Sequence, residues 1–79
     1  MSILQKIIRE KFEDIQPGDI AFFKNTDNKI VHVGIIHPDF QILHASGRVR
    51  MDKLNERGIL VMETNIITHE FSHSRRILN

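Results

Sequence analysis

The sequence predicts a small α+β domain, with an N-terminal helix followed by an antiparallel, barrel-like sheet. Three observations support this class. Apolar residues recur at helical spacing over residues 1–15. Segments rich in β-branched residues then alternate with polar turns from residue 19 onward. The chain has only 79 residues and no cysteine, so it is expected to form one domain with a thin core and no disulfide.

The predicted helix covers residues 1–15. Ser2 suits the N-cap, and Gln5 is the matching capping-box residue. The pair Pro17-Gly18 predicts a tight turn in which the glycine takes a positive φ, and Asp19 is expected to accept backbone amide hydrogens there. The buried face of this helix would contain Ile3, Leu4, Ile7, Ile8, Phe12 and Ile15.

Three strands are predicted next, over residues 19–24, 30–37 and 41–45. Each is rich in apolar, aromatic or β-branched residues, and short polar segments separate them. Consecutive strands joined by tight turns form an antiparallel meander. Residues 19–79 are therefore expected to be the sheet-bearing part of a single domain.

The rest of the chain gives weaker signals. Residues 51–57 are expected to form a turn or a short helical piece that ends at Gly58. The apolar run 59–62 is compatible with a strand or a helix, because it is too short for periodicity to decide. A final strand is predicted over residues 75–78.

Two histidines are expected to meet on one face of the sheet. If the hairpin loop consists of residues 37–39, His32 lies directly opposite His44, with Cβ atoms about 5 Å apart. Gly34, next on that face, would leave open space beside the pair. One imidazole would then act as a general base while the other fixes its tautomer. The alternative is that both are structural residues on a half-exposed face.

Composition excludes several classes of protein. The net charge is +1 and the chain has no basic run, which argues against a nucleic-acid binder. The longest apolar runs have four residues, too short for a membrane span or a signal-peptide core. The lack of cysteine excludes a thiolate zinc site, an iron–sulfur cluster and a cysteine nucleophile within these residues. No cofactor is expected.

Four short motifs occur in an order that resembles the NlpC family of papain-like cysteine peptidases, which cleave peptide bonds in bacterial cell-wall peptides. They are the Pro-Gly-Asp turn entering an aromatic strand at residues 16–23, His-Val-Gly-Ile-Ile at 32–36, His-Ala-Ser-Gly at 44–47 and Arg-Arg-Ile-Leu at 75–78. The resemblance implies that the sheet corresponds to the β-subdomain of the papain-like fold. It also implies that His32 is the catalytic base and that His44 orients it.

The chain departs from the family pattern at the nucleophile. The family cysteine lies at the start of a helix upstream of the Pro-Gly-Asp turn, and this sequence has none. We therefore expect the base-bearing half of a peptidoglycan peptide hydrolase, as a truncated product, half of a split enzyme or a degenerate module, inactive alone. A non-catalytic module that binds cell-wall peptides is the alternative. The resemblance suggests a periplasmic or extracellular location, although the chain shows no export signal.

Removing the helix that bears the cysteine would expose an apolar sheet face. We therefore expect the predicted helix to cover that face, or self-association or a complementing chain to do so. Cell-wall peptide is the expected ligand, and Ser46, Arg48 and Arg50 are the candidate substrate-binding residues. The two arginines would reach a peptide carboxylate, or else belong to a solvated charged face.

Residues 69–73 spell a competing motif, H-E-x-x-H, the zinc-protease pattern. On a helix, His69 and His73 would share a face and ligate one metal ion. The β-branched run at residues 66–68 disfavours a helix, and no His, Asp or Glu follows His73 to serve as a third ligand. No dedicated metal site is therefore predicted, and a weak zinc or nickel site at this pair is the alternative.

Overall fold

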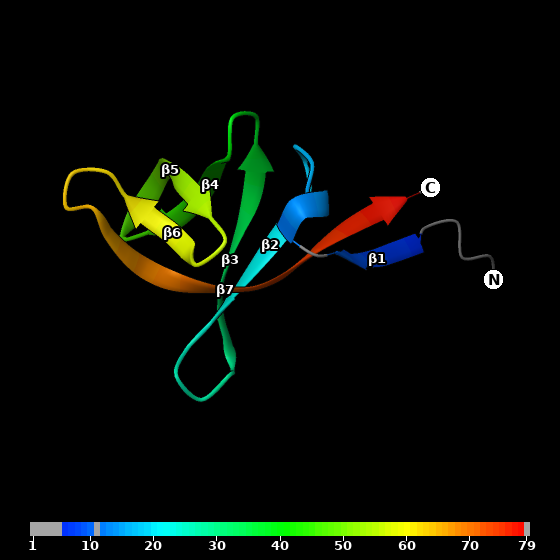
Figure 1. Ribbon diagram of the computed structural model, residues 1–79, viewed down its shortest axis with the longest axis horizontal. Helices are drawn as coiled ribbons and strands as arrows, with labels where there is room; N and C mark the ends of the chain where they lie inside the picture. Colours follow the sequence, from blue (N-terminus) through cyan, green and yellow to red (C-terminus); the bar gives the residue numbers. More distant parts are fainter. Residues whose placement is uncertain (1–5, 11, 79) are drawn as a thin grey trace.

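The computed structural model describes residues 6–10 and 12–78, and these are almost entirely strands (Figure 1). The only helical piece among them is one 3-10 turn, η1. The elements in chain order are β1 (Lys6–Glu10), η1 (Phe12–Asp14), β2 (Ile20–Lys24), β3 (Ile30–His37), β4 (Gln41–Ser46), β5 (Arg48–Asn55), β6 (Gly58–Val61) and β7 (Ile66–Leu78).

The strands β2 to β7 form a closed antiparallel barrel. Each pairs with the next along the chain, and β7 closes the ring by pairing with both β6 and β2. This is possible because β7 is 13 residues long. In Figure 1, β7 passes under the barrel and leaves it beside β1, its third partner. Closure removes free sheet edges and places one face of the sheet inside.

The predicted α+β class is therefore wrong. Of the predicted helix 1–15, residues 1–5 and 11 lie outside the described residues, and the rest form β1 and η1. The strand β1 pairs with residues 74–78 at the C-terminal end of β7, of which Ser74 and Arg75 also pair with β2. This pairing satisfies backbone groups that would otherwise line an open edge, and the adjacent Ile7 and Ile8 are β-branched residues that suit a strand.

The second half of the barrel also differs from expectation. Residues 51–57 are neither turn nor helix, because β5 extends from Arg48 to Asn55 and pairs with β4 over six residues. Residues 59–61 of the apolar run 59–62 belong to β6, and the last strand begins at Ile66 rather than Arg75. The inner face of β5 carries the buried Asp52 beside Leu54, whereas the apolar Val49 and Met51 are exposed, so this strand lacks the usual pattern of apolar residues inside.

The core fills the barrel interior. Phe23 and Ile42 are fully buried in it, and Phe12 of η1 packs against its edge, stacking on Phe40 and meeting Phe71 edge-on. Each large apolar side chain buried in this way stabilises the fold by about 1.5–3 kcal/mol. The buried apolar residues are Ala21, Phe23, Ile36, Ile42, Leu54 and Ile59.

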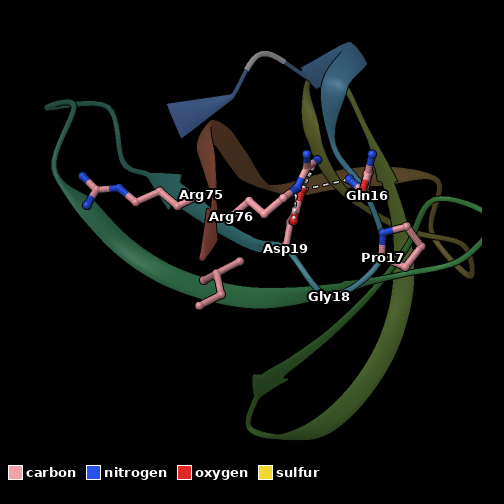
Figure 2. Close-up of a pocket in the computed structure, with 7 residues that line it drawn as sticks. Gln16, Pro17, Gly18, Asp19, Arg75 and Arg76 are labelled. Atoms are coloured by element: carbon pink, nitrogen blue, oxygen red, sulfur yellow. Dashed lines mark hydrogen bonds and ion pairs between the residues drawn. The ribbon is translucent and has the colours of Figure 1, made fainter. Parts of the chain in front are cut away.

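A partly buried ion pair joins the start of the barrel to its end (Figure 2). The Asp19 carboxylate accepts hydrogen bonds from Arg76 Nε and Nη2, both at 3.0 Å. It also accepts one from the backbone N–H of Gln16 at 2.8 Å. Gly18 takes the positive φ expected of the turn, +93°. Arg75 lines the same hollow, but Figure 2 shows its side chain extending away from this pair. The turn before β2 is thus anchored to β7.

No helix among residues 6–10 and 12–78 has the length and apolar character needed to cross a membrane.

Candidate functional site

A chain of hydrogen bonds links three side chains on the inner face of β3, β4 and β5. His32 Nε2 lies 2.9 Å from His44 Nδ1, and His44 Nε2 lies 2.8 Å from Asp52 Oδ2. His44 and Asp52 are buried, whereas His32 is half-buried. We call these three residues the His–His–Asp relay. It runs from solvent into the barrel.

The structure brings His32 and His44 together, although with a register different from the predicted one. The hairpin loop comprises residues 38–40, so Gly34 rather than His32 lies opposite His44. The two histidines are therefore diagonal neighbours. Because this register differs from the predicted one by two residues, and side chains alternate with a period of two, both rings still share the inner face.

Gly34 has a different role from the predicted one. A Cβ there would lie 2.7 Å from two side-chain carbons of Ile42. The space left by the missing side chain is therefore filled by Ile42, a core residue, and is not open as predicted.

Asp52 sets the charge at the buried end of the relay. Burial alone would raise the pKa of this carboxyl, but hydrogen bonds from Arg50 and His44 outweigh that effect and hold the pKa below its ordinary value. Arg50 Nε lies 2.7 Å from Asp52 Oδ2, and Arg50 also lies 3.5 Å from Glu63. Asp52 is thus a carboxylate at neutral pH and only accepts hydrogen bonds.

This carboxylate assigns the tautomers along the relay. A neutral His44 donates from Nε2 to Asp52, so its Nδ1 accepts a hydrogen bond from His32 Nε2. The proton on Nε2 leaves the lone pair of His32 on Nδ1. Within the described residues, Nδ1 of His32 has no hydrogen-bond partner. It is not fully buried, so it contacts solvent. The relay therefore presents one basic nitrogen outward.

A third histidine lies against the relay. The His69 ring on β7 stacks on that of His32, with centroids 4.0 Å apart and an interplanar angle of 21°. Sequence reasoning placed neither Asp52 nor His69 beside the histidine pair. Alternation along residues 48–55 would have placed Asp52 on the face of Leu54. The position of His69 depends on a distant strand and had no local signal.

The sequence profile of the NlpC/P60 family matches residues 4–72 of the 79. The chain belongs to the NlpC/P60 family. The resemblance seen in the four motifs is thereby confirmed, and the chain is a cell-wall peptidase-related domain. Comparisons with curated proteins and with solved structures gave no match.

The H-E-x-x-H motif of this NlpC/P60 domain lies in a strand and not on a helix. Alternation alone would put His69 and His73 on one face, but the register of β7 against β2 shifts between them, and this bulge turns them to opposite faces. His69 stacks on His32, whereas His73 stacks on Phe22, with centroids 4.8 Å apart. In the described part of the chain, no group of three or more His, Cys, Asp or Glu residues is arranged to hold a metal.

The candidate substrate-binding residues of this NlpC/P60 domain lie near the β4–β5 turn. Ser46 pairs with Arg48 across Gly47, and both are exposed. Arg50 differs, because its guanidinium contacts Asp52. The structure thus leaves Ser46 and Arg48 open to a ligand, while Arg50 supports the relay.

The stability of this domain is expected to fall as the pH drops below about 6.5, the ordinary pKa of histidine. Burial lowers the pKa of His32, as do the neighbouring His69 and His44 charges, and burial likewise lowers that of His69. The unfolded chain then binds more protons than the folded one, so stability is complete above the unfolded pKa and is lost as the pH falls toward the lower folded value.

Urea unfolding between pH 8 and pH 5 measures this dependence. We expect His32→Ala to flatten it and His37→Ala, in the hairpin, to leave it unchanged. If the stability of His32→Ala depended on pH as steeply as that of the parent, His32 would not be the cause of the pH dependence.

Proposed function

We propose that this domain supplies the base and the orienting residues of a cysteine-peptidase site that acts on peptidoglycan peptides. The observation that carries the proposal is the His–His–Asp relay, with spacings of 2.9 and 2.8 Å and a solvent-exposed Nδ1 on His32. The 79 residues contain no cysteine, so the thiol has to come from polypeptide outside them.

The chemistry assigns one task to each member of the relay. Nδ1 of His32 takes the proton of the thiol, and the thiolate attacks the peptide carbonyl carbon. The resulting imidazolium returns this proton to the leaving amine as the C–N bond breaks, which leaves an acyl-thioester for water to hydrolyse. His44 holds the His32 ring through Nε2, and Asp52 holds His44. The lowered pKa of His32 favours the neutral form that the first step needs.

The proposal includes a polypeptide partner that supplies the thiol and covers the outer face of the barrel. Apolar side chains there are 42–70% exposed. Strand pairing makes the face continuous, because Ile35 lies beside Leu43 and Leu43 beside Met51. Burying such a face favours association. The most exposed residues on it are Val31, Val33, Ile35, Val49 and Met51.

Complementation in trans tests this function. The chain is mixed with a cysteine-bearing N-terminal half of an NlpC/P60 enzyme, and cleavage of a cell-wall peptide is followed. We expect no thiol-dependent cleavage by the chain alone and measurable cleavage by the mixture. His32→Ala should lower that rate by about 10²–10⁴-fold, as loss of a general base does.

His37→Ala is the matched control, since it removes a histidine that does not contact the relay. Equal loss in both variants would contradict a specific role for His32. Binding of the peptide by a mixture that never cleaves it would overturn the catalytic proposal and favour a non-catalytic binding module. Self-association of the chain, seen by sedimentation, without binding of the cysteine-bearing half would overturn the proposed partner.

A further inference from the structure

The stack of His69 on His32 is the closest ring contact of the site. The two rings are nearly parallel, whereas His44 meets both at steep angles, with centroids 5.0 Å from His32 and 5.9 Å from His69. The buried Phe23 ring lies 5.9 Å from that of His32 and 6.3 Å from that of His69. Neighbouring rings thus contact His32 from β2, β4 and β7.

The backbone holds His69 in this place through two irregularities. The register of β7 against β6 shifts so that His69 pairs with Ile59, while the next pair joins Leu60 to Ile67 and leaves Thr68 as the extra residue. Gly58 allows β6 to approach β7 closely, since a Cβ there would overlap the carbonyl oxygen of His69. Thr68 Oγ1 lies 2.9 Å from His69 Nδ1 and orients the ring.

We propose that His69 is a positioning residue for the base, and that its ring keeps the His32 imidazole in the plane where Nε2 reaches His44 and Nδ1 stays open to solvent. This inference rests on the proposed function. Without the stack, the half-buried His32 side chain has other rotamers available, and a misplacement of about 1 Å at a reacting group can cost on the order of 10²-fold in rate.

The charges around His32 also favour a role for His69 in controlling the base. The ionisable groups that face it are His69 from β7 and His44 from β4, with Asp52 of β5 behind His44. A proton on His32 would be repelled by positive charge on either neighbouring imidazole. The stack therefore opposes protonation of the base as well as rotation of its ring.

Ring NMR of the histidines tests this role without any nucleophile. We expect the parent His32 to be a single tautomer protonated at Nε2. In His69→Ala, tautomers should mix and the midpoint of His32 titration should move upward. In His69→Phe, which keeps a stacked ring without charge, the tautomer should persist while the midpoint still rises. Unchanged tautomer and titration of His32 in His69→Ala would overturn the proposal.

His73→Phe is the matched control, because it replaces another stacked imidazole of β7 that faces Phe22 and not the relay. It should leave His32 unchanged, and an equal effect in both phenylalanine variants would reject a specific role for His69. Amide spectra that match those of the parent show that each variant is folded. If His69→Ala does not fold, His69→Gln is used in its place and is expected to mix the tautomers of His32 in the same way.

Complementation separates this inference from the proposed function. In an active mixture, His69→Ala should lower kcat about tenfold with little change in KM and shift the acid limb of the pH profile upward, whereas His69→Phe should recover most of the rate. If the parent mixture never cleaves, the proposed function fails, while the NMR result still decides whether His69 positions His32.

Discussion

Replacing Asp52 with alanine is expected to lower the cleavage rate of the complemented site on the order of 10²-fold. The carboxylate is the only acceptor that the described structure provides for His44 Nε2. Its removal leaves that buried N–H unpaired and frees His44 to take the other tautomer. His44 would then donate from Nδ1 toward His32 Nε2, and the proton of His32 would move to Nδ1, the atom that has to act as the base.

Asp52→Asn gives an intermediate case that makes the test sharper. An amide oxygen at the position of Oδ2 can still accept from His44 Nε2, so the tautomer should persist, while the negative charge and the acceptor for Arg50 Nη2 at Oδ1 are lost. We expect the parent to be fastest, Asp52→Asn to be slower and Asp52→Ala to be slowest. Asp52→Ala should also be less stable than the parent by about 1–3 kcal/mol, because it leaves the buried N–H of His44 without an acceptor.

Nitrogen NMR of the His44 and His32 rings measures the tautomers, and urea unfolding measures the stability. Asp27→Ala, at an exposed carboxylate in the β2–β3 turn, is the control and should change neither. Retention of a single His44 tautomer in Asp52→Ala would show that the carboxylate does not control the relay.

Gly58→Ala is expected to destabilise the barrel by more than about 4 kcal/mol, beyond the range of ordinary substitutions. Gly58 has φ +150°, a value that residues with a side chain rarely adopt, and a Cβ would overlap the backbone of His69 on the neighbouring strand. Backbone of another strand cannot move aside as a flexible side chain does. The β6–β7 pairing that closes the barrel would have to open.

Gly47→Ala is the matched control. Gly47 also has a positive φ, +74°, but a Cβ there meets nothing within 4 Å, so only the conformational cost of about 1–2 kcal/mol remains. Circular dichroism and urea unfolding compare the two variants. If both lose the same stability, the close approach of β6 to β7 is not what closes the barrel.

Part of this fold could be predicted from local pattern alone. The strands near residues 20–24, 30–37 and 41–46 follow from β-branched segments bounded by turn residues. The shared face of His32 and His44 also follows from local pattern. Side chains alternate with a period of two, so a difference of two residues between the predicted and observed registers leaves both rings on the same face. The strand at residues 6–10 could not be predicted in this way, because its apolar residues fit helical spacing and its partner lies about 70 residues away.

The amino-acid sequence by itself determined the lack of a thiol, the order of the family motifs and the common face of the two histidines. These are properties of composition and short-range alternation. Only the tertiary structure decided that the sheet closes through β7, that Asp52 completes the relay, and that His69 stacks on His32 while His73 turns away. Those outcomes depend on bulges and pairings between distant segments, and such contacts arise from burial and backbone hydrogen bonding across the whole barrel.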